Sequence, residues 1–173
     1  GFENDFVPKG AAFTRKRKAA RKKLLQIANC LTGAQFDDNT LIIGTSGRYE
    51  FRNKGIDEFV EAMNRLNRDE RLSKPVVAFV EVPAWVGDAR EDLKKRIDSG
   101  KTFDTPLEVP MVTHWLHNMD KDSVLSMMKY NDMENRKEDR VKLIFLPCYL
   151  TGNDGIVNLN YFDVIIGKDL SAY

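Results

Sequence analysis

The sequence predicts an α/β fold in which a parallel β-sheet carries helices on its faces. Three short apolar runs, as in strands buried on both faces, stand at Leu41–Gly44, Val76–Val82 and Val141–Leu146. Amphipathic segments with helical spacing precede and separate these runs. Strands that alternate with helices form parallel sheets with right-handed connections. The chain has 173 residues, the length of one domain.

The first element in the chain is an expected helix over Thr14–Leu31. One apolar stripe recurs in it at spacings of four, three and four residues: Ala20, Leu24, Ile27 and Leu31. Thr14 is placed to cap its start, and Gly33 is placed to end it.

Later elements follow from the same spacing rules. Further helices are predicted at Asp57–Asn67, Trp85–Ile97, Ser123–Met133 and Leu159–Ile166. Asp122 or Ser123 can cap the third of these. Ser99–Pro110 is expected to be a loop, Met111–His114 a short strand, and Leu170–Tyr173 the start of another strand.

The net charge of +1 conceals an uneven distribution. Eight basic residues and no acidic one lie between Lys9 and Lys23, and the rest of the chain carries 19 basic and 26 acidic residues. The expected helix that carries most of these basic residues could bind nucleic acid or another polyanion. No aromatic residue for base stacking lies among the basic residues from Arg15 to Lys23. A solvated helix face is therefore favoured, and nucleic acid is not expected as a partner.

Composition excludes several other classes. No stretch approaches the roughly 20 apolar residues of a membrane helix, and no secretory signal is visible. Cys30 and Cys148 are the only cysteines, too few for a disulfide scaffold, which favours a reducing, cytoplasmic location. His114 and His117 are the only histidines, so a zinc site has few ligands available, and no metal or cofactor is expected.

The segment from Gly44 to Asp57 leaves a buried strand and enters a helix. Ligands of open α/β sheets bind at the carboxyl ends of strands, where Gly44 and Gly47 allow close approach of the backbone. Arg48 offers a planar fork for phosphate oxygens, and Lys54 adds a charge just before a helix N-terminus. A diphosphate fits this arrangement. The segment matches neither common glycine-rich nucleotide motif, so a solvated basic loop is the alternative.

The residues 46–57, SGRYEFRNKGID, closely resemble the start of the C-terminal domain in glycogen synthases of the eukaryotic, family 3 glycosyltransferase type. Thr113 and His114, followed by Asn118 and Asp120, resemble a second motif of that family. The residues 139–147, DRVKLIFLP, resemble a third. Residues 1–8 resemble the hinge that enters this domain, and the first helix also has a counterpart there. These motifs occur in the family's order over most of the chain.

This resemblance implies a Rossmann-like C-terminal half of a two-domain, GT-B type retaining glycosyltransferase. The family transfers glucose from a nucleotide donor to the 4-hydroxyl at the end of an α-1,4-glucan such as glycogen. UDP-glucose is the expected donor, and ADP-glucose remains open. By similarity, Arg48 and Lys54 are catalytic because they hold the donor diphosphate and neutralise charge on the leaving phosphate. The donor-binding residues implied are Gly47, Arg48, Lys54, His114, Pro147 and Tyr149.

The resemblance also divides the chain. Residues 1–38 are expected to form the interdomain hinge segment and basic helix. Residues 39–173 are expected to form a nucleotide-sugar-binding domain that is incomplete at its C-terminus. The family's N-terminal domain and its donor-binding carboxylate segment are absent, so the piece should be inactive alone. The stretch between Pro83 and Val112 is shorter than in eukaryotic members. Three positions depart from the family pattern: Trp115, Leu146 and Cys148.

Other interpretations stay open. A non-catalytic α/β module could bind a partner or polyanion through the basic helix, and a different sugar-nucleotide transferase could share the fold. His114 could contact a sugar hydroxyl, act as a base or ligate a metal, although a lone histidine is more often structural. Cys148 is expected to pack rather than react. Tyr149 could pack near a nucleotide base or cover the sheet edge.

Overall fold

The computed structural model describes residues 10–48 and 54–172. Its helices are α1 (Gly10–Thr32), α2 (Lys54–Arg68), α3 (Glu91–Ser99), α4 (Ser123–Tyr130) and α5 (Tyr161–Gly167). Its strands are β1 (Leu41–Ser46), β2 (Val76–Glu81), β3 (Val86–Ala89), β4 (His114–Leu116), β5 (Val141–Leu146) and β6 (Leu170–Ala172). None of the helices in these described ranges combines the length and apolar character that a membrane span requires.

Four parallel strands form the main sheet in the order β5-β2-β1-β6. Ile43 of β1 pairs with Ala78 of β2 on one side and with Leu170 of β6 on the other. The chain therefore builds outward from β1 through β2 to β5 and then returns to add β6 on the opposite side. This reversal beside β1 is the topological switch point at which open α/β sheets bind ligands. The predicted parallel α/β class is confirmed.

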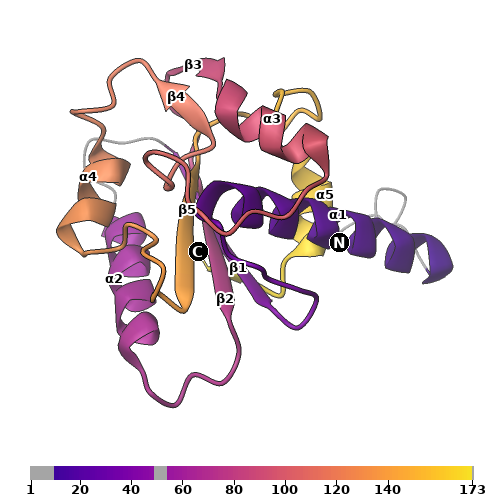
Figure 1. Cartoon of the computed structure of the whole chain (residues 1–173), viewed down its shortest axis with the longest axis horizontal. Helices are drawn as coiled ribbons and strands as arrows, with labels where there is room; N and C mark the ends of the chain where they lie inside the picture. Colours follow the sequence, from indigo (N-terminus) through magenta and orange to yellow (C-terminus); the bar gives the residue numbers. More distant parts are fainter. Residues whose placement is uncertain (1–9, 49–53, 173) are drawn as a thin grey trace.

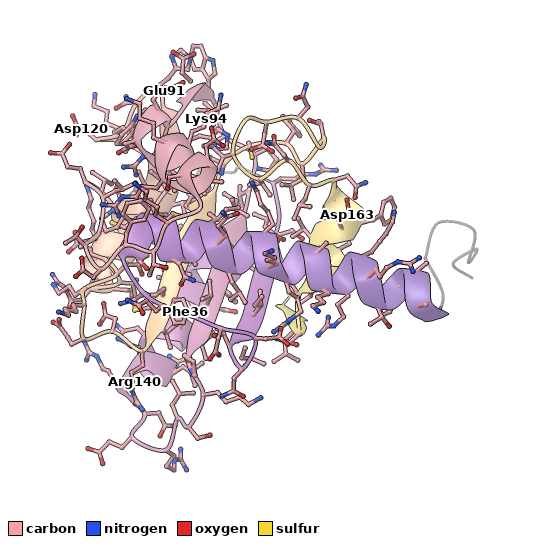
Figure 2. The ribbon with its side chains drawn as sticks, turned by 45° about the vertical axis from the view of Figure 1, so that its right-hand side comes forward. Phe36, Glu91, Lys94, Asp120, Arg140 and Asp163 are labelled. Atoms are coloured by element: carbon pink, nitrogen blue, oxygen red, sulfur yellow. The ribbon has the colours of Figure 1, made fainter. Side chains whose placement is uncertain are left out.

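Helices cover both faces of the sheet. Alternate strand residues point to opposite sides, and the residues on both sides are apolar. Val77 and Phe79 pack with α1, α3 and α5, whereas Ala78 and Val80 pack with α2 and α4. Figure 1 shows these two helical layers on either side of the strands. Figure 2 shows α1 lying across one face, with Arg140, just before β5, at the lower edge of the sheet. The strands consequently end toward the top of that view.

Helix α1 begins earlier than predicted, at Gly10 instead of Thr14. The Thr14 hydroxyl donates to the Gly10 carbonyl at 3.2 Å, so Thr14 lies within the helix and does not cap it. The predicted end is confirmed, since the helix ends at Thr32 and Gly33 has a φ of +74°.

The basic residues of α1 have two environments. Arg21 is 8% exposed and donates to the main-chain carbonyls of Thr40 and Gly167. Arg17 donates to the carbonyls of Ile166 and Lys168. Both arginines thus satisfy acceptors at the C-terminal end of α5, where the helix dipole favours cations. The expectation of a wholly solvated face was wrong for these two residues, because their partners come from a segment about 150 positions away.

The predicted helix Trp85–Ile97 was wrong in its first half. Residues Val86–Ala89 form β3, which pairs antiparallel with β4, and only Glu91–Ser99 is helical. Exposed Gly87 and Asp88 disfavour helix, and the partner strand supplies hydrogen bonds that helical spacing cannot reveal. Leu93 and Ile97 are buried, in agreement with the helical register of the second half.

The strand predicted at Met111–His114 is also displaced. The amide of Phe145 donates to the Met111 carbonyl at 2.8 Å, and that of Thr113 donates to the Phe145 carbonyl. Val112 accordingly forms only an isolated bridge along β5, and the named strand β4 starts at His114. A short segment beside β5 therefore replaces the expected strand, because the chain turns away to meet β3.

The remaining predictions hold with small shifts. Asp122 caps α4 by accepting from the Leu125 amide at 2.8 Å, although the helix ends at Tyr130 instead of Met133. Met133 is nevertheless buried in the core. Helix α5 begins at Tyr161 behind an Asn160 capping box, later than expected. The predicted last strand is confirmed as β6.

Replacing Gly33 with alanine is expected to lower stability far more than replacing Gly100. Both glycines follow a helix with similar positive φ, +74° and +64°. A Cβ at Gly33 would lie 2.5 Å from the Thr105 backbone, whereas one at Gly100 meets nothing within 4 Å. We expect backbone strain to lower the free energy of unfolding by about 1–2 kcal/mol in each variant. The clash with Thr105 should lower it by about 1–3 kcal/mol more in Gly33→Ala.

Thermal unfolding of the two variants measures this difference. At about 2–4 °C per kcal/mol for a domain of this size, Gly33→Ala should melt several degrees below Gly100→Ala. Equal melting temperatures would show that the Thr105 segment moves away at no cost.

Candidate functional site

A pocket lies at the carboxyl edge of the sheet, where β1, β2 and β5 end side by side. Its volume is about 420 Å³. Its lining comes from all three strand ends and from the start of α5: Ser46, Gly47, Glu81, Pro83, Cys148, Tyr149, Leu150, Thr151 and Tyr161. Two of the predicted donor-binding residues, Gly47 and Tyr149, therefore line one pocket although about 100 residues separate them.

The predicted phosphate-binding residues belong to the connection from β1 to α2. The Gly47 amide donates to the Glu81 main-chain carbonyl at 3.3 Å, which fixes the end of β1 against β2. Arg48 follows directly and is exposed. Lys54 is the first residue of the 15-residue helix α2, whose N-terminal dipole favours anions. Residues 49–53 and the Lys54 side chain lie outside the described part of the structure.

Pro147 and Tyr149 stand at the end of β5. Pro147 is buried, and its carbonyl accepts from the Ala84 amide at 2.8 Å, which joins the loops after β2 and β5. Tyr149 is 73% exposed. An aromatic ring so exposed covers little of the sheet edge, and its predicted contact with a nucleotide base stays a prediction.

His114 occupies a closed hydrogen-bond network. Its Nδ1 lies 2.8 Å from the Thr113 hydroxyl, and its Nε2 lies 3.2 Å from the Asp154 carbonyl oxygen and 3.3 Å from Asp154 Oδ2. Both neighbours of Nε2 are acceptors, so Nε2 carries the proton. The imidazole is 3% exposed and does not line the pocket. Its predicted contact with the donor stays a prediction.

Asp154 organises the loop between β5 and α5. Its carboxylate accepts from the amides of Ile156, Val157 and Asn158 as well as from His114. Burial raises the pKa of this carboxyl, but the hydrogen bonds from His114 and the three amides outweigh that effect and hold it well below its ordinary value. Asp154 is therefore an ionised anchor of the pocket wall.

Cys148 lies in the same wall. Burial, reinforced by the Asp154 carboxylate, raises the pKa of its thiol to about 12. A protonated thiol is a poor nucleophile, which agrees with the expectation that Cys148 packs.

One group of possible metal ligands occurs among the described residues. Ligand atoms of His114, Cys148 and Asp154 lie within 4.8 Å of one another. Both Asp154 oxygens accept backbone amides, so hydrogen bonds within the chain account for this grouping.

Comparison with known proteins assigns the family. The sequence model of the family described as glycogen synthase matches residues 29–97 and 87–173. The chain belongs to the glycogen synthase family. Its relatives include glycogen [starch] synthase isoform 2 of Saccharomyces cerevisiae, 28% identical over 195 residues, and the Caenorhabditis elegans glycogen [starch] synthase, 29% identical over 189 residues. Each alignment covers 79% of this chain and 28% of the relative.

The chain thus spans less than a third of the length of these glycogen synthases. The yeast alignment extends over 195 positions, more than the 173 residues available, so the relative contains residues that this family member lacks. The two segments of this chain that match the family model overlap at residues 87–97. This overlap falls inside the stretch between Pro83 and Val112, which sequence reasoning expected to be shorter than in eukaryotic members.

Sequence reasoning missed a buried ion pair that involves Glu81, one of the residues that line the pocket of this glycogen synthase family member. Lys168 Nζ donates to Glu81 Oε2 at 2.9 Å, and both side chains are at most 5% exposed. Burial raises the pKa of the Glu81 carboxyl, and Lys168 counteracts this. The sequence did contain a signal for a buried charge here, because Glu81 is the single charged residue in the apolar run Val76–Val82.

Proposed function

We propose that this chain supplies the donor-binding part of a retaining glucosyltransferase. The enzyme transfers glucose from UDP-glucose to the 4-hydroxyl at the end of an α-1,4-glucan such as glycogen. The observation that carries the proposal is the pocket at the carboxyl ends of β1, β2 and β5 in a glycogen synthase family member, with Arg48 directly after the pocket-lining Gly47. Relatives named glycogen [starch] synthase support the reaction class.

Arg48 and Lys54 are assigned to the donor diphosphate. The guanidinium can bind two phosphate oxygens at once, and the dipole of α2 adds positive potential at the same place. As the bond between glucose and phosphate breaks, negative charge grows on the leaving diphosphate, and these cations stabilise it. Their effect is thus larger in the transition state than in the bound donor.

The remaining predicted residues take supporting roles in this proposal. Gly47 lets the diphosphate approach the main chain, and the exposed Tyr149 ring packs against the base. Pro147 and His114 position the wall behind Tyr149, through the Ala84 amide and the Asp154 loop respectively. The glucan and the catalytic groups that act on glucose are assigned to parts of the full protein beyond this chain, which by itself should bind donor without turnover.

Calorimetric titration with UDP and ADP tests the proposal. The parent chain should bind UDP with a dissociation constant on the order of 0.1–1 mM, as expected for part of a site, and ADP more weakly. Arg48→Ala should weaken UDP binding at least tenfold. Arg68→Ala is the matched control, because Arg68 is also exposed but ends α2 instead of preceding it. An Arg48→Ala protein that binds UDP as the parent does would overturn the assignment.

The alternative is a module that binds polyanions through α1. Arg17 and Arg21 are engaged within the fold, which leaves fewer basic side chains on that surface. The same titration separates the two functions. Binding of UDP and ADP that is equal, unaffected by Arg48→Ala and abolished by salt would indicate the module.

A further inference from the structure

Another pocket lies along helix α1. Its volume is about 510 Å³, within the range of small-molecule sites. Residues that are three or four positions apart, and so share one side of the helix, line it: Lys18, Lys22, Leu25, Gln26 and Asn29. The loops at residues 35–38 and 100–103 complete the wall. This pocket shares no lining residue with the pocket at the carboxyl edge of the sheet, so the proposed donor site does not account for it.

Side chains of the neighbouring helices hold both loops in place. Asn29 Oδ1 accepts from the Phe36 amide at 2.8 Å, and Asn29 Nδ2 donates to the Phe36 carbonyl at 3.1 Å. Arg96 of α3 donates to the Thr105 carbonyl, and its guanidinium lies 4.4 Å from the centroid of the Phe103 ring. Figure 2 shows Phe36 on one side of α1 and α3 on the other. Each loop thus brings one half-buried phenylalanine to the pocket in a fixed position.

The two amide side chains that α1 brings to the pocket are already engaged within the fold. Asn29 is paired with the main chain of Phe36, and Gln26 Nε2 donates to the Ile97 carbonyl at 3.2 Å. A sugar presents hydroxyl groups on most of its surface and loses affinity where they find no partner. Leu25 and the two phenylalanines instead offer apolar contact. The pocket therefore suits a ligand with an apolar body better than a sugar.

The charge at this pocket is positive. Three lysines line it: Lys18, Lys22 and Lys101. All three are exposed, and their ammonium groups have no ion-pair or hydrogen-bond partner among the residues that the structure describes. The two acidic residues of the lining have partners of their own, since Asp38 lies 3.3 Å from Arg21 and Asp37 accepts from the Asn39 amide. Uncompensated lysines at the mouth of an apolar pocket favour an anionic group on the ligand.

We propose that this pocket binds a small carboxylate with an apolar body, the body against Phe36 and Phe103 and the carboxylate at Lys18 and Lys22. The two lysines are one turn apart on α1, so both ammonium groups can reach one anion. The described lining contains no arginine, whose planar fork matches phosphate oxygens, whereas an ammonium is a compact point charge. The apolar contact supplies affinity, and the charge fixes the orientation of the ligand. This site does not depend on the proposed donor site.

Calorimetry at constant ionic strength tests this inference with 2-naphthoate, its neutral analogue 2-naphthalenemethanol, and acetate. The parent should bind 2-naphthoate at least tenfold more tightly than either of the other two. The double variant Lys18→Gln/Lys22→Gln should weaken 2-naphthoate binding at least fivefold and leave binding of the alcohol unchanged. Substitutions at exposed side chains without partners seldom disturb folding. Phe103→Leu, which shortens the apolar contact, should weaken binding of both 2-naphthoate and the alcohol.

Lys94→Gln/Lys95→Gln is the matched control, because it makes the same change of net charge at two exposed lysines of α3 that do not line the pocket. It should leave 2-naphthoate binding intact. Equal losses in the two lysine variants would show a general attraction of anions to a basic surface and would overturn the site. A parent that binds 2-naphthoate no more tightly than acetate would overturn it as well, whether or not the same protein binds UDP.

Discussion

Replacing Arg90 with methionine is expected to destabilise the protein by about 3–5 kcal/mol, the range for removing one partner of a buried charged network. Arg90 is fully buried. Its guanidinium donates to both carboxylate oxygens of Asp92 and to the main-chain carbonyls of Glu108, Val109 and Val112. It also lies 4.0 Å from the centroid of the Trp115 ring. Methionine fills similar volume but satisfies none of these acceptors.

The loop that Arg90 holds explains why the loss should be large. Val109 has a φ of +46°, an unfavourable conformation for a β-branched residue. Arg90 bonds its carbonyl at 2.7 Å and the preceding carbonyl, of Glu108, at 2.6 Å. The same loop leads into Met111, which pairs with β5. Loss of Arg90 therefore removes the hydrogen bonds that hold this unfavourable conformation and loosens the edge of the sheet.

Urea unfolding at neutral pH measures this effect against Arg96→Met. Arg96 lies in α3, the helix that Arg90 immediately precedes, donates to the Cys30 and Thr105 carbonyls and stacks over Phe103, but is only half-buried. We expect Arg96→Met to cost about 1–2 kcal/mol, since solvent can replace part of its contacts. A loss for Arg90→Met no greater than for Arg96→Met would contradict the structural role.

Replacing Asp154 with asparagine is expected to destabilise the protein by about 2–4 kcal/mol at pH 7, because hydrogen bonds to a charged acceptor are worth about 1.5–3 kcal/mol each and only some survive. Its carboxylate accepts from three amides between 2.8 and 3.1 Å and from His114. An asparagine side chain keeps one acceptor oxygen and turns an amide group toward donors. The loop behind Cys148 should loosen in consequence.

The effect should depend on pH in a defined direction. The pKa of Asp154 is lower in the folded protein than in the unfolded chain. Its contribution is therefore complete above the ordinary carboxyl pKa of about 3.9 and decreases as pH falls below it. The difference in unfolding free energy between parent and Asp154→Asn should be constant from pH 7 to about 5 and shrink toward pH 3. Asp98→Asn, an exposed carboxylate of α3, is the control and should change stability by less than about 0.5 kcal/mol. A difference that does not vary with pH would contradict the ionised anchor.

Part of the candidate site could be predicted from sequence because its signals are local. Gly47 and Arg48 come within four residues of the end of an apolar run, and the carboxyl end of such a strand is where ligands bind. Tyr149 follows another run in the same way, and the structure brings it to the pocket that Gly47 lines. The antiparallel pair β3 and β4 could not be predicted, because each strand is short and its stability depends on a partner about 25 residues away.

The sequence by itself determined the parallel strands, the helices between them and the family, because apolar periodicity and ordered motifs are properties of neighbouring residues. Only the tertiary structure decided which charges are buried. Charged residues in a linear pattern indicate solvent exposure, yet Arg21, Arg90 and Glu81 are all buried. A buried charge is tolerated only where partners surround it, and the partner of Glu81 lies 87 residues away, so folding alone brings them together.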